Sequence, residues 1–187
     1  IGSSESVLWG GTIDGVAEAR VVETNLGNLA ADAYEDAAES FLAEAKGMES
    51  YQGLPVVAAE NGGGIRASLP KGEVTKGDFI NIFPFSNTLM IKEITPKILF
   101  GLLENSVSAI YGQDKETGLL TADANGGFLQ VSGIRFIYDP EKEQGEKVLS
   151  VVLEATGEEL DRKDEKTRIL FVSTRIFFII WGISPPS

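Results

Sequence analysis

The stretch Asn61-Gly62-Gly63-Gly64-Ile65-Arg66 decides how the rest of the sequence is interpreted. It follows an apolar run at residues 54–59, which predicts a buried strand. Three successive glycines have no side chains to pack, so they allow backbone conformations with positive φ and close approach of another group. Asn61 adds an amide at the strand end, and Arg66 adds a planar cation with five donors. The pattern fits a polar pocket for a ligand with several acceptors, and equally a glycine-rich turn with a solvated arginine.

The composition is that of an acidic globular domain. The chain has 187 residues, of which 43% are hydrophobic, enough for one domain with a sizeable core. We therefore treat residues 1–187 as a single domain. The formal net charge is -12, from 28 acidic and 16 basic residues, which argues against a surface that binds nucleic acid. The first five residues lack the basic and apolar parts of a signal peptide, and we expect the chain to be part of a larger protein.

The sequence contains neither histidine nor cysteine. The usual zinc ligands and the usual general base at neutral pH are therefore missing from it, and a Ser-His-Asp triad cannot form within it. Carboxylates remain as ligands for Mg²⁺ or Ca²⁺, but no Asp/Asn/Gly loop has the spacing of a calcium site. We expect no metal site, no cofactor and no catalytic residue in this chain.

Two helices are predicted from capping residues and apolar spacing. The first begins at residues 24–25, carries an apolar stripe at three-four spacing and ends at Gly47. Its acidic residues are interpreted as a solvated face. The second begins at Thr95-Pro96, a capping residue followed by a proline at the first helical position, and ends at Gly112.

Strands are predicted around these helices. Residues 7–23 are expected to be extended, and residues 113–127 to form a loop. Ser132-Gly133 separates two short strands or makes a bulge in one. The stretch from Ile169 to Ile183, which includes the apolar run at residues 176–181, is too short for a membrane-spanning helix, and Arg175 interrupts it. The remaining predicted strands are residues 89–94, 128–131, 134–138, 148–153 and 169–172.

Four separated motifs together resemble the C-terminal domain of the 5'-nucleotidase family, which also includes UDP-sugar hydrolases and 2',3'-cyclic-nucleotide phosphodiesterases. The resemblance covers about residues 18–140 in the family's order. The motifs are Arg20-Val21-Val22-Glu23-Thr24-Asn25-Leu26-Gly27-Asn28-Leu29, the stretch from Asn61 to Arg66, Gly77-Asp78 with Phe83-Pro84-Phe85-Ser86-Asn87-Thr88, and Gly126-Gly127-Phe128-Leu129-Gln130-Val131-Ser132-Gly133.

The resemblance implies an α+β fold, a layered domain with mixed β-sheets sandwiched between helices. It implies a two-domain hydrolase at the cell surface, in the periplasm or secreted. In such an enzyme an N-terminal metallophosphoesterase domain, which this chain lacks, carries two divalent metal ions and hydrolyses the phosphate ester. The C-terminal domain binds the nucleotide or nucleoside. A stand-alone module that binds nucleosides or sugars without hydrolysis, and an acidic domain without a ligand, remain alternatives.

Carried over by motif position, the substrate-binding residues are Arg20, Asn61, Gly63, Arg66, Phe85 and Phe177. The arginines and Asn61 would contact the polar groups of the substrate, and the two phenylalanines would hold the base between them. Without the family, Arg20 is a surface charge beside a strand and Phe85 is a core residue. The tail departs from the family pattern, since Trp181 replaces a glycine and Ile183 replaces the aspartate that would bind ribose.

Overall fold

The computed structural model describes residues 1–13 and 16–174, and its centre is a four-stranded mixed sheet. The strand order is β6 (Leu89–Ile94), β12 (Ile169–Thr174), β4 (Val56–Asn61) and β9 (Leu129–Ser132). β12 and β4 run parallel, whereas β6 and β9 pair antiparallel to their neighbours. The carboxyl ends of β4 and β12 therefore lie at the same edge of the sheet.

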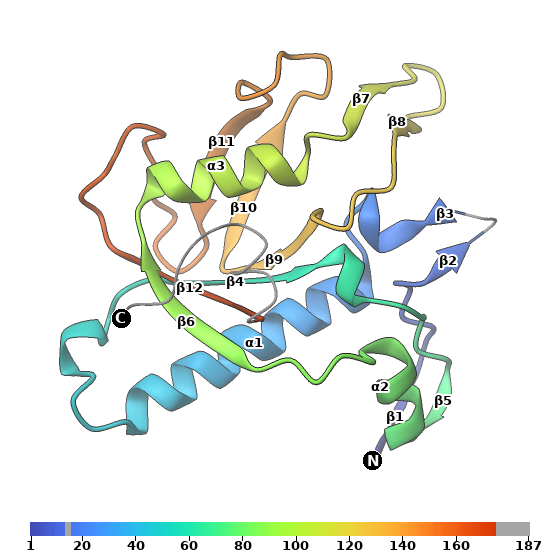
Figure 1. The fold of residues 1–187 in the computed structure, drawn as a ribbon, viewed down its shortest axis with the longest axis horizontal. Coiled ribbons are helices and arrows are strands. Elements are labelled where there is room, and N and C mark those ends of the chain that lie inside the picture. Colours follow the sequence, from blue (N-terminus) through green and yellow to red (C-terminus); the bar gives the residue numbers. More distant parts are fainter. Residues whose placement is uncertain (14–15, 175–187) are drawn as a thin grey trace.

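Two helices cover opposite faces of this sheet (Figure 1). Alternate residues of β4 divide between them: Val56 and Ala58 pack with the cluster of α1 (Asn25–Glu44). Val57 and Ala59 pack with the cluster of α3 (Pro96–Ser106). This period of two is the pattern of a strand buried on both faces. The α+β class with a mixed sheet sandwiched between helices is confirmed.

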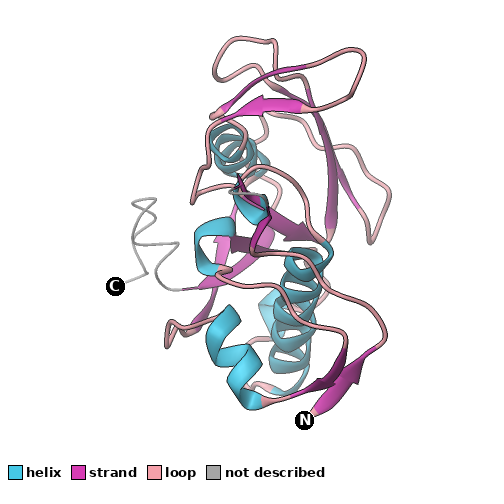
Figure 2. Ribbon diagram, turned by 90° about the vertical axis from the view of Figure 1, so that its right-hand side faces the viewer, coloured by secondary structure: helices cyan, strands magenta, loops and turns pink. Residues whose placement is uncertain are grey.

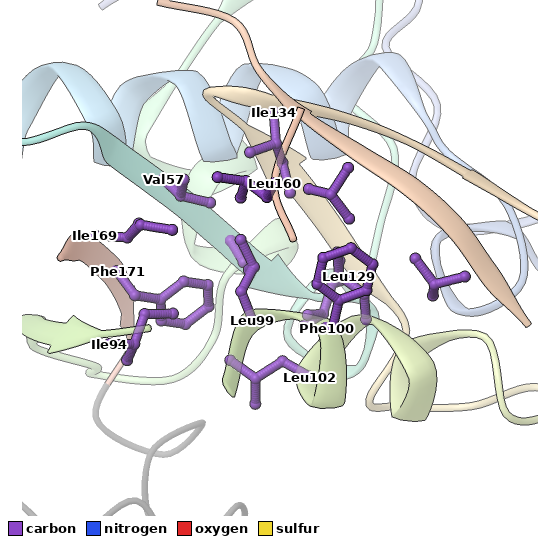
Figure 3. Close-up of a cluster of buried hydrophobic side chains, with 14 of the residues drawn as sticks. Val57, Ile94, Leu99, Phe100, Leu102, Leu129, Ile134, Leu160, Ile169 and Phe171 are labelled. Atoms are coloured by element: carbon purple, nitrogen blue, oxygen red, sulfur yellow. The ribbon is translucent and has the colours of Figure 1, made fainter. Parts of the chain in front are cut away.

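The larger hydrophobic cluster lies on the α3 side of the sheet (Figure 3). Leu99 and Phe100 of α3 point into it, and Phe171 of β12 meets them from the sheet. Leu99 is fully buried, as expected for the apolar stripe of a packed helix. The other residues labelled in Figure 3 are Val57, Ile94, Leu102, Leu129, Ile134, Leu160 and Ile169.

Small two-stranded sheets complete the fold. β1 (Gly2–Ser4) pairs with β5 (Gly72–Val74), and β2 (Thr12–Ile13) pairs with β3 (Val16–Ala17). β7 (Ile110–Gln113) pairs with β8 (Leu120–Ala122), and β10 (Ile134–Tyr138) pairs with β11 (Val148–Leu153). In Figures 1 and 2 the N-terminal strand lies at the end of the molecule opposite to β7, β8 and β11. The remaining elements are α2 (Lys76–Ile82) and the 3-10 helices η1 (Glu18–Arg20), η2 (Glu49–Tyr51) and η3 (Gly62–Gly64).

The predicted end of the second helix at Gly112 is wrong. α3 ends at Ser106, and Ile110 begins β7, where it is buried and pairs with Ala122. The apolar stripe continues through Ile110 because this side chain enters the same cluster from a strand. Residues 113–127 are likewise not all loop, since β8 lies within them. The apolar spacing of the sequence does not distinguish a residue in the last turn of a helix from the first residue of a strand, because both side chains are buried.

Other boundaries also differ from the sequence predictions. α1 ends at Glu44, before the predicted stop at Gly47, which instead has φ 84° in the following turn. The described part of residues 7–23 contains the short strands β2 and β3 and the 3-10 helix η1, so it is not extended throughout. No helix in residues 1–13 or 16–174 is both long enough and apolar enough to cross a membrane.

Gly133 separates two strands that belong to different sheets. β9 pairs with β4 in the central sheet, whereas β10 pairs with β11. Gly133 has φ 79°, and a Cβ there would lie 2.4 Å from the carbonyl oxygen of Val56. The two-strand alternative is therefore correct, and the turn between the strands requires glycine on both conformational and steric grounds.

Candidate functional site

The turn at residues 61–66 lies at the carboxyl end of β4, against a loop at residues 125–128. The Asn61 Nδ2 group donates to the Gly126 carbonyl oxygen at 3.2 Å, and the Gly63 N–H donates to the same oxygen at 2.9 Å. The Gly62 N–H donates to the Phe128 carbonyl oxygen at 2.7 Å. These bonds hold the turn against a segment that is distant in sequence.

The glycines are required for close approach and not for their backbone angles. None of Gly62, Gly63 and Gly64 has positive φ, so that part of the sequence prediction is wrong. A Cβ at Gly62 would lie 1.9 Å from the Ala19 carbonyl oxygen, and one at Gly64 would lie 1.8 Å from Glu60 Oε1. Both distances are far below a van der Waals contact. The expectation that other groups come close to this backbone is confirmed.

Arg20 is tied to the same loop. It is the last residue of η1 and half-buried, and its carbonyl oxygen accepts the Asn125 N–H at 3.0 Å. Asn125 is thus bonded to the Arg20 backbone, and the neighbouring Gly126 is bonded to both Asn61 and Gly63. Three of the predicted site residues meet at the Asn125–Gly126 pair, although Arg20 is far in the chain from Asn61 and Gly63.

Arg66 lies at the exposed end of the turn. Its Nη1 donates to the Gly63 carbonyl oxygen at 3.4 Å, a long contact that leaves most of the guanidinium free to bind a ligand. Its backbone N–H donates to the Ile82 carbonyl oxygen at 2.9 Å. The turn is therefore joined to the last residue of α2.

α2 is an element that the sequence analysis did not assign, and it positions Phe85. Thr75 and Asp78 form a reciprocal capping box at its N-terminus, a Thr-x-x-Asp pattern that was visible in the sequence. The bonds from Thr75 lower the pKa of the Asp78 carboxyl. Since Ile82 accepts the Arg66 N–H, the chain leaves α2 beside the turn, and Phe85 follows three residues later.

The Phe85 side chain is 47% exposed. The alternative that it is a core residue is therefore wrong, and its ring is available to an incoming ligand. Arg66 is hydrogen-bonded to Gly63, Asn61 and Gly63 share the Gly126 carbonyl oxygen, and the Arg20 backbone is bonded to the neighbouring Asn125. Phe85 lies on the segment that follows α2. Phe177 lies outside the described residues.

Asn125 is a site residue that was not predicted from the sequence. Its Nδ2 approaches the carbonyl oxygens of Asn105 and Ser106 at 3.3 and 3.4 Å, and its Oδ1 accepts the Gly127 N–H at 2.9 Å. Asn125 thereby fixes the loop to the end of α3. The Asn125-Gly126-Gly127 sequence, a turn pattern, was the available sign of it.

The described residues offer no metal centre at this site. Within residues 1–13 and 16–174 no group of three or more His, Cys, Asp or Glu side chains is placed to hold a metal ion. The site instead offers amide, backbone and guanidinium donors with an exposed aromatic ring. Such a set can bind a flat ligand that carries several oxygen acceptors.

Comparison with known proteins identifies the family of this chain. The model of the 5'-nucleotidase C-terminal domain family matches residues 2–167. The trifunctional nucleotide phosphoesterase protein YfkN of Bacillus subtilis is 36% identical over 144 residues, which are 76% of this chain and 8% of that protein. An apyrase of Tabanus yao is 33% identical over 132 residues, which are 70% of this chain and 21% of that protein.

Solved structures agree with the sequence comparisons. The crystal structure of the 5'-nucleotidase precursor from Thermus thermophilus has a TM-score of 0.68 and 29% identity, over 94% of this chain and 29% of that chain. This chain therefore spans less than a third of the length of the relatives that it matches. Because the family model covers most of the sequence, the chain belongs to the 5'-nucleotidase C-terminal domain family.

Proposed function

We propose that this chain is the nucleotide-recognition domain of a larger phosphoric ester hydrolase. The observation that carries the proposal is the meeting of Arg20, Asn61 and Gly63 at the Asn125–Gly126 pair, beside Arg66. Guanidinium and amide donors match ribose and phosphate oxygens, and the exposed Phe85 ring can stack on a base. Arg20, Asn61, Gly63, Arg66 and Phe85 are the substrate-binding residues that we propose.

The hydrolytic chemistry belongs, in this proposal, to a preceding domain of the same protein. The relatives named above are a phosphoesterase and an apyrase, and this chain spans only 8% and 21% of their lengths. Two divalent metal ions in that preceding domain would supply the attacking hydroxide and stabilise the leaving oxygen. The residues of this chain would bind and orient the base and the ribose.

Location outside the cytoplasm is part of the proposal. The solved relative from Thermus thermophilus is described as a precursor, which supports processing of an exported chain. A cell-surface, periplasmic or secreted protein would meet extracellular nucleotides. Fractionation of the source cells, with an antibody against this domain, tests the location, and recovery in the cytoplasm alone would contradict it.

Calorimetric titration of the chain with adenosine and with AMP tests the recognition role. We expect binding of both, and no phosphate release from AMP when Mg²⁺ or Mn²⁺ is added. Absence of binding in both titrations would contradict the proposal and favour a domain without a ligand. Phosphate release by the chain alone would contradict the proposal that a preceding domain carries out the hydrolysis. Binding without any hydrolysis by the full-length protein would favour the stand-alone module.

A further inference from the structure

Glu60 is a buried carboxyl group that the proposed binding site does not use. It lies at the end of β4, directly before Asn61, and is 1% exposed. Its Oε2 accepts a hydrogen bond from the Tyr34 hydroxyl of α1 at 2.9 Å. A buried carboxyl group is costly unless it is hydrogen-bonded, so its presence next to the turn calls for an explanation.

The second oxygen of Glu60 lies against the turn itself. A Cβ added to Gly64 would lie 1.8 Å from Glu60 Oε1, so the carboxyl group occupies the space that a side chain at residue 64 would need. Gly64 is the last residue of η3, two residues before Arg66. The position of this oxygen therefore limits where the end of the turn can lie.

Uncharged groups flank Glu60 within the sheet. On β9 its register partner is Gln130, whose amide is bound to the Ala19 and Val22 carbonyl oxygens. On β12 the register that pairs Val172 with Ala58 places Thr174 next to Glu60, on the same face. Thr174 is 2% exposed, and its hydroxyl has no hydrogen-bond partner among the described residues.

The proton affinity of Glu60 follows from this enclosure. Burial raises the pKa of Glu60 to about 7, while the hydrogen bond from Tyr34 acts in the opposite direction. Burial also raises the pKa of Tyr34, with the Glu60 charge adding to the effect, so Tyr34 remains a donor at neutral pH. Tyr34 is the titratable group that the structure places against Glu60. Both charge states of Glu60 are therefore populated near pH 7.

We propose that Glu60 is a positioning residue for the turn at residues 61–66, and that ligand binding by this turn depends on whether Glu60 carries a proton. The ionised carboxylate accepts a charge-assisted bond from Tyr34 and holds its other oxygen against Gly64. Protonation weakens that bond and frees the carboxyl group, next to the Thr174 hydroxyl, for which the described residues provide no hydrogen-bond partner. The ionised state is the one that holds the turn for binding. The binding part of this inference rests on the proposed function.

The backbone amides of Gly63 and Gly64 report on Glu60 without any ligand. The chain has no histidine, and burial raises the pKa of Glu60 to about 7, so Glu60 is expected to titrate near neutrality. In ¹H–¹⁵N NMR spectra recorded from about pH 5 to about pH 9, both amides should shift with one midpoint of about 7. Glu60→Gln should abolish this titration. Tyr34→Phe should move the midpoint upward, because the hydrogen bond that favours the ionised form is lost.

Glu35→Gln is the matched control, since Glu35 is a half-buried carboxyl group of α1 that contacts Ser132 and not the turn. It should leave the Gly63 and Gly64 titration unchanged. The positioning role is overturned if these amides do not titrate near neutrality, or if they titrate equally in Glu60→Gln. Should Glu60→Gln fail to fold, the midpoint shift in Tyr34→Phe decides the same point.

Adenosine binding tests the functional half, because adenosine, unlike AMP, has no phosphate that titrates in this range. At one pH unit below the Glu60 midpoint about a tenth of the molecules are ionised, so the apparent Kd should rise up to about tenfold. Glu60→Gln should remove this dependence on pH. An equal Kd on both sides of the midpoint, with the amides titrating, would overturn the link to binding. Absence of adenosine binding at every pH would instead overturn the proposed function, and the amide titration would still decide the positioning role.

Discussion

The Gln130 side chain of β9 lies over Gly27 of α1, where a Cβ on the glycine would be 2.2 Å from the Gln130 Oε1 atom. The same oxygen accepts the Thr24 N–H at 2.8 Å. The Gln130 Nε2 donates to the carbonyl oxygens of Ala19 at 3.0 Å and Val22 at 2.8 Å. One buried amide therefore joins the start of α1, the segment that carries Arg20 and the central sheet.

Gly27→Ala should lower the free energy of unfolding by about 1–3 kcal/mol, because the added methyl group must displace Gln130 from a packed site. Urea denaturation measures this change. The matched control is Gly101→Ala in α3, an exposed position where a Cβ meets nothing within 4 Å. There alanine should stabilise the helix by about 0.5–1 kcal/mol. Equal effects at the two glycines would show that Gly27 is an ordinary helical position.

Arg66→Ala should weaken AMP binding by about 1.5–3 kcal/mol, which is about tenfold or more in Kd, through the loss of charge-assisted hydrogen bonds. The loss should be smaller at high salt, where the attraction in the wild-type protein is already screened. Calorimetry at two salt concentrations measures both effects. Arg135→Ala, which removes an exposed arginine of β10, is the control and should leave the Kd unchanged. An unchanged Kd in Arg66→Ala would mean that the glycine motif is only a turn.

Phe85→Ala should weaken adenosine and AMP alike by about 1–3 kcal/mol, the range measured for stacking of a base on an aromatic ring. Salt should matter little, because stacking involves no net charge. Thermal stability should be nearly unchanged, since the ring is 47% exposed. Phe41→Ala, at a ring that is 52% exposed on α1, is the matched control for binding. A lower Tm with an unchanged Kd would assign Phe85 a structural role.

Ser132 in β9 lies between two carboxyl groups of α1. Its Oγ is 2.6 Å from Asp32 Oδ1 and 2.5 Å from Glu35 Oε2. A hydroxyl group has one proton, so the two carboxyl groups compete for the single Ser132 donor. Burial raises the pKa of Glu35 above its ordinary value of 4.5, the hydrogen bond from Ser132 lowers it, and the charges of Glu39, Asp32 and Glu154 raise it further.

Glu35→Gln should therefore stabilise the protein more as the pH rises. A carboxyl group whose folded pKa is raised favours the folded state while it is protonated, and this contribution is lost as the pH rises through the folded pKa. The difference in Tm between Glu35→Gln and wild type should be smallest near about pH 4 and larger near about pH 8. Glu44→Gln, at the exposed end of α1, is the control. A Tm difference that does not vary with pH would contradict the raised pKa of Glu35.

Helix starts and buried strands could be predicted from the sequence, because each depends on residues close in the chain. α1 begins at Asn25 behind the capping residue Thr24, and α3 begins at Pro96, both as predicted. Helix ends could not. Ile110 continues the apolar spacing of α3, yet its pairing with Ala122 places it in a strand, and nothing near Ile110 in the sequence specifies that partner.

The residues of the candidate site were assigned by motif resemblance, whereas the contacts among them are known only from the fold. The sequence alone determined that the chain is an acidic domain without histidine or cysteine, carrying Asn61, three glycines and Arg66 behind a buried strand. Only the tertiary structure decided why the glycines are there and what they face. Gly62 meets Ala19, and Gly63 meets Gly126, because β4, η1 and the loop at residues 125–128 converge at one edge of the sheet. Such contacts join segments far apart in the chain, so they depend on strand order and register rather than on local residue patterns.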